Sequence, residues 1–118
     1  MTIKLYGIPN CDSIKKAKHW LAENEVEYQF HDYKKLGADK DTLKAWSKKV
    51  GWEALLNRRG TTWRKLSESE RGTELNENHA IRLMIENSSL IKRPVVTVDK
   101  TVIVGFDETE FAKLLLDN

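Results

Sequence analysis

The first third of the chain alternates between hydrophobic and polar positions in a way that indicates strand, helix and strand. Residues 2–6 and residues 28–33 each alternate and are rich in strand-forming side chains. Between them, apolar positions recur with helical spacing, at Ile14, Ala17 and Leu21. We expect Asn10, in a turn of Gly, Pro and Asn, to cap this helix and Asn24 to end it. Strand, helix and strand within about thirty residues form a βαβ unit, which predicts parallel strands.

The middle of the chain, about residues 40–90, has helical rather than alternating periodicity. Apolar positions indicate two amphipathic helices. The first is opened by Asp41 or Thr42, is stopped by Gly51 and carries Leu43, Trp46 and Val50 on one face. The second is capped by Asn76 and carries Ala80, Ile81, Met84 and Ile85. Between these helices we expect a short helical turn over residues 52–56 and a polar loop over residues 57–62.

Two β-branched runs follow, at residues 94–98 and 101–104, and only Asp99 and Lys100 separate them. Two such runs joined by two residues predict a β-hairpin. A closing helix is indicated by the apolar positions Phe111, Leu114 and Leu115. The order β-α-β, helices, β-β-α is that of an α/β, thioredoxin-like fold.

The length of 118 residues suits one domain, residues 1–118. We expect a four-stranded mixed sheet with residues 1–5 and 94–98 at or near its centre. The helical segment of about residues 40–90 is then an insertion between the βαβ unit and the C-terminal ββα unit, and it should contain no strand.

Composition narrows the class of protein. Hydrophobic residues make up 40% of the chain and charged residues 32%, which suits a core beneath a charged surface. No apolar run reaches the roughly 18 residues of a membrane span, and we expect no signal peptide, so the prediction is a soluble cytoplasmic protein without membrane contact. The single cysteine excludes an internal disulfide, a Cys-x-x-Cys pair and a multi-cysteine zinc site, and the three histidines are too scattered to suggest a metal site.

Charge is unevenly distributed, although the net charge is only +2. Residues 1–65 hold 14 Lys and Arg against 8 Asp and Glu, whereas residues 66–118 hold 6 against 10. A basic half is consistent with an anionic ligand such as a phosphate, an oxyanion or the carboxylates of glutathione, and equally with lysines on solvated helix faces. The basicity is well below that of dedicated nucleic-acid binders, which argues against a nucleic-acid partner.

Cys11 is the sharpest chemical feature. It follows a predicted strand and turn and opens the predicted helix, which places its sulfur near unpaired backbone N–H groups and the positive end of the helix dipole. Helix N-termini lower the pKa of a cysteine thiol to between about 3.5 and 7.5, so we expect the thiolate at neutral pH. A lone cysteine can also pack as a small hydrophobic residue, but the neighbours Asn10, Asp12 and Ser13 form no core pattern. The sequence therefore indicates a nucleophile.

Three ordered segments carry further motifs: Gly7-x-Pro9-Asn10-Cys11 with Ser13-Ile14-Lys15-Lys16-Ala17, residues 55–66 (LLNRRGTTWRKL) and residues 91–96 (IKRPVV). Together they resemble the arsenate reductase/Spx family, and most closely its YffB-like branch, over essentially the whole chain. The resemblance implies that Cys11 is the redox nucleophile and that Pro94 is a cis-proline next to it. It also implies that Arg93 faces the thiolate and its anionic adduct, as a fixed cation with a planar donor fork.

Two departures from the family pattern concern the substrate. The arsenate reductases carry an arginine that an ungapped match places on Asn57, whereas the Spx-like pattern places it on Arg59. We therefore assign a catalytic role to Arg59 and keep Arg58 as the alternative. A further reductase arginine corresponds to Gly105. Because a compact oxyanion gains specificity from several convergent donors, this loss argues against arsenate.

A single thiol also limits the mechanism. The Spx redox switch uses a Cys-x-x-Cys pair, but its second position is Ile14 here. An external thiol, glutathione or glutaredoxin, would have to resolve a mixed disulfide on Cys11. We expect glutathione as co-substrate and no tightly bound cofactor. The residues expected to bind substrate or glutathione are Asn10, Ser13, Lys15, Arg58, Trp63 and Pro94.

The sequence thus predicts a cytoplasmic, glutathione-dependent monothiol oxidoreductase. Two alternatives stay open: arsenate reduction by the same cysteine, and a non-catalytic Spx-like regulator that docks on a protein such as RNA polymerase.

Overall fold

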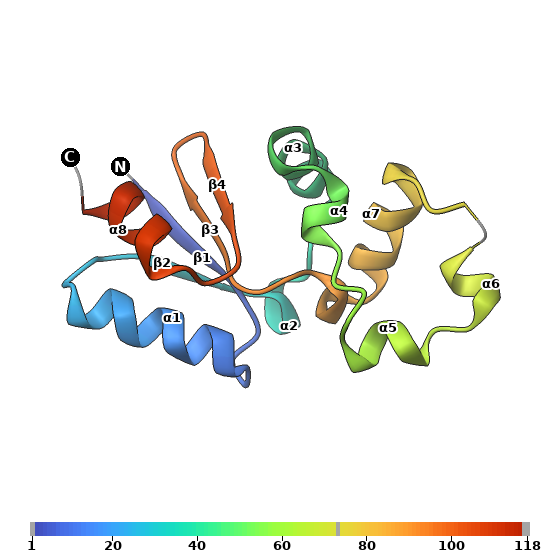
Figure 1. Ribbon diagram of the computed structural model, residues 1–118, viewed down its shortest axis with the longest axis horizontal. Coiled ribbons are helices and arrows are strands. Elements are labelled where there is room, and N and C mark those ends of the chain that lie inside the picture. Colours follow the sequence, from blue (N-terminus) through green and yellow to red (C-terminus); the bar gives the residue numbers. More distant parts are fainter. Residues whose placement is uncertain (1, 73, 117–118) are drawn as a thin grey trace. The chain divides into compact units, whose positions relative to one another are not determined.

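The computed structural model describes residues 2–72 and 74–116 (Figure 1). The chain forms two compact units, the first made of Met1–Leu36 and Arg93–Asn118 and the second of Gly37–Lys92. The second unit spans nearly the same residues as the predicted insertion. That the whole chain is a single domain stays a prediction.

The first unit is built on a four-stranded mixed sheet with the strand order β2-β1-β3-β4. Strand β1 (Ile3–Gly7) pairs in parallel with β2 (Gln29–Asp32) and antiparallel with β3 (Val95–Val98), which in turn pairs antiparallel with β4 (Thr101–Val104). The hairpin turn contains Asp99 at a φ of 53°, in the left-handed region that two-residue hairpin turns use. The predicted parallel pair, the hairpin and the central positions of β1 and β3 are confirmed.

Two helices contribute to the hydrophobic core of this unit, α1 (Asp12–Glu23) and α8 (Glu108–Leu115) (Figure 1). The core cluster joins alternate strand residues to the apolar faces of both helices: Ile3, Leu5, Ala17, Trp20, Leu21, Val96, Val98, Phe111 and Leu115. Trp20 and Phe111 meet edge to face, with ring centroids 5.5 Å apart. Period-2 alternation in the strands and period-3.6 spacing in the helices therefore converge on one core.

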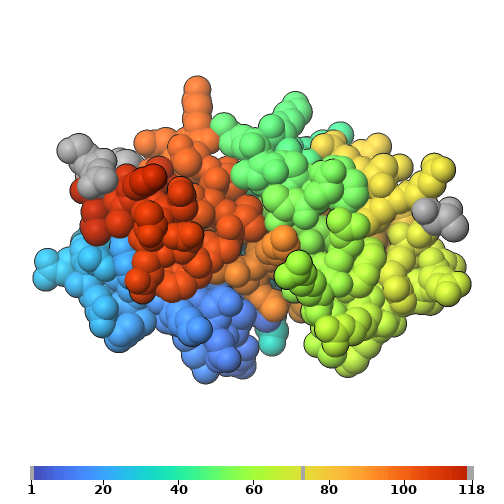
Figure 2. All heavy atoms as spheres, viewed as in Figure 1, coloured from blue at the N-terminus to red at the C-terminus, as the bar shows by residue number. Residues whose placement is uncertain are grey.

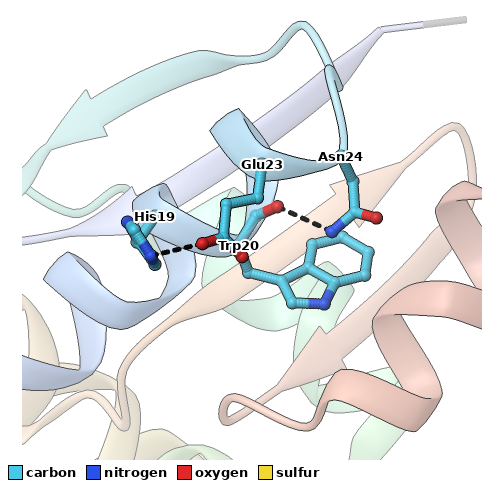
Figure 3. A network of polar contacts seen from close by, with 4 residues as sticks. All are labelled: His19, Trp20, Glu23 and Asn24. Atoms are coloured by element: carbon cyan, nitrogen blue, oxygen red, sulfur yellow. Dashed lines mark hydrogen bonds and ion pairs between the residues drawn. The ribbon is translucent and has the colours of Figure 1, made fainter.

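Helix α1 ends as predicted, at Asn24. Figure 3 shows the Asn24 side chain donating a hydrogen bond of 2.9 Å to the carbonyl of Trp20, which satisfies one of the last free carbonyls of the helix. One turn earlier, His19 Nε2 lies 2.7 Å from Glu23 Oε1 on the exposed face. The C-terminal end of α1 is thus set by a local side-chain contact.

The described residues of the second unit form helices, turns and connecting segments, with no β-strand. It contains α3 (Lys40–Val50), α4 (Trp52–Leu55), α5 (Thr61–Lys65), α6 (Glu68–Arg71), α7 (Glu77–Glu86) and the 3-10 turn η1 (Ser88–Leu90). Its only β pairing there is an isolated bridge between Leu56 and Ile91. Ser47 Oγ of α3 donates a hydrogen bond of 2.7 Å to Glu77 Oε2 of α7. The expectation of a segment without strands holds for the described residues.

Two helix starts differ from the prediction. Cys11, not Asn10, is the N-cap of α1, because the backbone stays extended through Cys11 and turns helical at Asp12. Asp39, not Asp41 or Thr42, caps α3: its carboxylate accepts a hydrogen bond from the Thr42 backbone N–H, three residues into the helix.

Short helices also replace residues predicted as strand or loop. Tyr33 leaves the second strand and opens α2 (Tyr33–Leu36), because Asp32 Oδ1 accepts a hydrogen bond from Lys34 N and turns the chain. Thr61 and Thr62, predicted as loop, belong to α5. In α7 the predicted core residue Ile85 is 39% exposed, since the buried face includes Leu83 instead. No helix in the described parts of the chain is long and apolar enough to cross a membrane.

Candidate functional site

The register of the sheet brings three loops of the first unit to one end. Gly7, the last residue of β1, pairs with Asp32, the last residue of β2. Tyr6 pairs with Val95, the first residue of β3. The segments that follow β1 and β2 and the segment that precedes β3 therefore leave the sheet at the same end. We call this end, which carries Cys11, Tyr33, Arg93, Pro94 and Gly105, the thiol end.

Cys11 is half-buried at the N-cap of α1. Its carbonyl accepts the first helical hydrogen bond, 3.0 Å from Lys15 N, but its side chain makes no capping hydrogen bond. The first-turn N–H groups are thus free of a side-chain cap next to the sulfur. Gly7 allows this placement, because a Cβ there would overlap the Ile14 side chain of the first turn of α1. The predicted position of Cys11 at a helix start is confirmed.

The Arg93–Pro94 peptide bond is cis, as predicted. Pro94 is buried and Arg93 half-buried, just before β3. The carbonyl of Pro94 accepts a hydrogen bond of 2.8 Å from Gly105 N, which joins the end of β4 to the same site. Gly105 has a φ of +90°, and no atom lies within 4 Å of the place where a Cβ would stand. The position that corresponds to a reductase arginine is therefore at the thiol end and has open space beside it.

Tyr33 is a candidate site residue that was not predicted from the sequence. Its side chain is 4% exposed, and its ring centroid lies 5.5 Å from that of His31 and 6.2 Å from that of Tyr6. Burial raises the pKa of Tyr33 far above its usual range, Tyr6 adds to this rise, and the Arg93 guanidinium opposes it. The phenol is therefore neutral at physiological pH and lies within the electrostatic field of Arg93. The available signal was its place directly after a strand parallel to the one that precedes Cys11.

The predicted cations Arg58 and Arg59 lie in the second unit, where both line one cavity of about 370 Å³ together with Glu53, Leu56 and Lys92. Main-chain hydrogen bonds join the segment around Leu56 to the segment that ends at Lys92. Lys92 N donates to Leu55 O at 2.8 Å, and Asn57 N donates to Leu90 O at 2.7 Å. Three cations against one carboxylate make this cavity suited to an anion. Lys92 was not predicted as a site residue, although it stands next to Arg93 in the sequence.

Asn57 shapes the loop that carries the two arginines. Its side-chain Oδ1 accepts a hydrogen bond of 3.1 Å from Arg59 N, an arrangement typical of Asx turns. Asn57 therefore acts on the loop, at the position where an ungapped match with the arsenate reductases expects a cation.

Trp63 lines a second cavity of about 370 Å³, which Arg58 also borders. The guanidinium of Arg71 lies over the Trp63 ring, 5.8 Å from its centroid, and the same arginine donates two hydrogen bonds to Leu66 O. Trp63 is thus a half-buried wall residue of a basic cavity. Side chains of α4, α5 and α6, coloured green to yellow, reach the face seen in Figure 2.

The remaining predicted residues flank Cys11. Asn10 and Lys15 are exposed and Ser13 is half-buried at the start of α1. The structure therefore gathers the predicted residues in two groups, one at the thiol end of the first unit and one around the cavities of the second. Among the described residues, no three His, Cys, Asp or Glu side chains lie together in a way that could hold a metal ion.

Curated relatives match along nearly the whole chain. A protein of Haemophilus influenzae, described as uncharacterized, is 41% identical over 109 residues, which cover 92% of this chain and 95% of the relative. The global transcriptional regulator Spx of Streptococcus pyogenes is 30% identical over 115 residues, covering 96% of this chain and 84% of the regulator.

Solved structures also match along nearly the whole chain. The YFFB protein is 46% identical, with a TM-score of 0.93 over 97% of this chain and 99% of that one. An arsenate reductase (ArsC) related protein from Brucella melitensis is 45% identical, with a TM-score of 0.76 over 96% of this chain and 93% of that one. The model of the ArsC family matches residues 6–114. These matches agree with the motifs around Cys11 and Arg93, and the chain, with its thioredoxin-like fold, belongs to the ArsC family.

Proposed function

We propose that this protein is a cytoplasmic thiol oxidoreductase that uses Cys11 as its nucleophile and an external thiol, glutathione or glutaredoxin, as its reductant. The observation that carries the proposal is the placement of Cys11. The cysteine is a half-buried N-cap without a side-chain capping bond, at the same end of the sheet as Arg93 and cis-Pro94. Membership of the ArsC family, which includes proteins named as arsenate reductase related, supports an oxidoreductase.

The proposed reaction is thiol–disulfide exchange. The Cys11 thiolate attacks the glutathione sulfur of a mixed disulfide between glutathione and another thiol, the new S–S bond to Cys11 forms as the old one breaks, and the electron pair leaves with the other thiol as its thiolate. A further glutathione thiolate then attacks the mixed disulfide, which releases Cys11 as thiolate and forms glutathione disulfide. Because the chain has one cysteine, the second step needs this external thiol.

The cations would bind the anionic groups of the substrate. We assign Arg93, at the thiol end, to the anion next to the reacting sulfurs, within direct or water-bridged reach of the Cys11 sulfur. The cavity of Arg58, Arg59 and Lys92 suits carboxylates such as those of glutathione. Arg59 keeps its proposed catalytic role, and Arg58, which also borders the Trp63 cavity, is proposed as a binding residue.

Intact-mass spectrometry after exposure to glutathione disulfide tests the proposal. We expect one glutathione per chain, removed by excess reduced glutathione, and none on Cys11→Ser. A matched variant, Lys16→Ala, changes an exposed residue of α1 but keeps the thiol, and it should still take up one glutathione. Absence of the adduct on a folded protein whose Cys11 is alkylated by iodoacetamide would refute the reaction.

A regulator of the Spx kind is the second candidate, and the 30% identity to the Streptococcus pyogenes regulator over 96% of this chain is the observation that favours it. A regulator would bind a protein such as RNA polymerase whether or not Cys11 reacts. Binding to purified RNA polymerase, unchanged in Cys11→Ser, together with absence of the glutathione adduct, would support the regulator instead.

Arsenate reduction is the third candidate, since the Brucella melitensis relative is named as arsenate reductase related. Gly105 argues against it, because the thiol end lacks the cation that the reductases place there. We expect little or no arsenite from arsenate, even with glutathione and glutaredoxin present. Robust arsenite production that is lost in Cys11→Ser would contradict this expectation.

A further inference from the structure

The hydroxyl of Tyr33 is buried without a hydrogen-bond partner. Among the described residues, Tyr33 Oη is the buried side-chain oxygen that no donor or acceptor reaches, although the Tyr33 ring itself packs against Tyr6 and His31. A buried polar atom without a partner destabilises the folded state. A phenylalanine would provide the same ring contacts without this cost, so the hydroxyl needs a reason other than packing.

The location of Tyr33 supplies such a reason. Tyr33 directly follows β2 at the thiol end, and the Arg93 guanidinium is close enough to oppose the rise in the Tyr33 pKa. The neutral phenol offers oxygen lone pairs, whereas a guanidinium is donor-only, with N–H groups on more than one edge. One edge of Arg93 can therefore face an anion while an N–H of another edge faces Tyr33.

We propose that Tyr33 is a positioning residue for Arg93: its phenolic oxygen accepts a hydrogen bond from the guanidinium when an anionic disulfide binds at the thiol end. The bond satisfies the buried hydroxyl and fixes the guanidinium fork toward the anion. This inference rests on the proposed function, because it assigns Arg93 to the anionic part of the substrate.

The test compares two disulfides on Tyr33→Phe, using stopped-flow or quenched mass spectrometry. Glutathione disulfide carries carboxylates, and bis(2-hydroxyethyl) disulfide is neutral. We expect the rate with glutathione disulfide to fall about tenfold, because a hydrogen bond to a charged group is lost, while the rate with the neutral disulfide changes less than twofold. The free variant should melt about 3 °C or more above the wild type, because an unsatisfied hydroxyl is removed.

Two controls separate the possible causes. Tyr28→Phe removes a hydroxyl just before β2, at the other end of that strand, and should alter neither rate. In an Arg93→Ala background, Tyr33→Phe should have no further effect on glutathione disulfide, because the positioned group is gone.

The outcomes are distinguishable. Equal slowing with both disulfides, or a melting temperature below that of the wild type, would show that the hydroxyl has a structural role and would overturn the inference. Failure of the wild type to react with the neutral disulfide as well would instead refute Cys11 as a nucleophile, and with it the proposed function.

Discussion

Replacing Gly7 by alanine should push the first turn of α1, and Cys11 with it, away from β1. Gly7 is buried and lies in a strand, without a positive φ, so the cost is steric rather than conformational. An added Cβ would lie 2.7 Å from Ile14 Cγ1 and would overlap Ile14 Cδ1. Ile14 is 0% exposed, so its side chain has no solvent to move into.

Overpacking of this kind costs about 1–3 kcal/mol of the free energy of unfolding. Truncation of Ile14 to alanine should cost about 2–5 kcal/mol through lost contacts and a cavity. In the double variant Gly7→Ala with Ile14→Ala, the new methyl group occupies part of that cavity. We therefore expect the double variant to be more stable than the sum of the single effects predicts, by about 1–2 kcal/mol.

Urea denaturation measures all three variants, and the rate of Cys11 alkylation reports the local displacement. Gly7→Ala should lower the denaturation midpoint at an unchanged slope and change the alkylation rate. Gly37→Ala is not a suitable control, because Gly37 has a φ of +74°, where alanine is itself strained. The control is Ala22→Gly, at an exposed site in α1. The argument that Gly7 permits the close packing of α1 on β1 would be refuted by two results together: purely additive free energies of unfolding, and an unchanged rate of Cys11 alkylation in Gly7→Ala.

Two further predictions concern the second unit. Arg59→Ala and Lys92→Ala should each raise the glutathione disulfide concentration for half-maximal reaction several-fold, as measured by intact mass. The control Lys100→Ala, in the hairpin turn, should not raise it. Equal effects of all three substitutions would indicate general charge attraction. A hydrogen bond from the Ser67 backbone N–H lowers the pKa of Glu70, and a bond with the Ser67 hydroxyl contributes. The capping box of α6 therefore stabilises the protein at pH values above the ordinary Glu pKa. This contribution is lost as the pH falls through the lowered pKa of Glu70. Ser67→Ala should therefore raise the Glu70 pKa in an NMR titration, and an unchanged value would contradict the capping box as the partial cause.

The long periodic elements were predictable, because each signals its structure several times over. Helix α1 repeats its apolar spacing over three turns, and the hairpin combines two β-branched runs with a two-residue turn. The short helices α2, α5 and α6 were not predicted, since a segment of four or five residues completes about one turn and shows no period. Asp39 was missed for a related reason: a cap is defined by the hydrogen bond it accepts, and several Asp and Thr residues near it could have served.

The residues of the candidate site likewise include some that the sequence predicts and some that it does not. Cys11, Arg93 and Pro94 are marked by motifs in the sequence itself. Tyr33 depends on tertiary structure, because only the parallel register of β1 and β2 shows that residue 33 leaves the sheet at the end that carries Cys11. Lys92 similarly depends on the main-chain bond to Leu55 that places it on the wall of a cavity. The predicted βαβ unit carried part of the first signal, whereas the main-chain bond of Lys92 has no counterpart in the linear pattern of the chain.

The uncapped start of α1 couples the chemistry of the sulfur to the order of the helix. A charged sulfur at this position can accept hydrogen bonds from the first-turn amides, as a capping side chain would, while a disulfide to glutathione carries no such charge. In the proposed reaction, formation of the adduct would therefore remove a possible acceptor for these amides, which have no side-chain cap in the structure. Amide hydrogen exchange at the first turn of α1 should then be faster in the adduct than in the reduced protein, so that the backbone reports the redox state of its single cysteine.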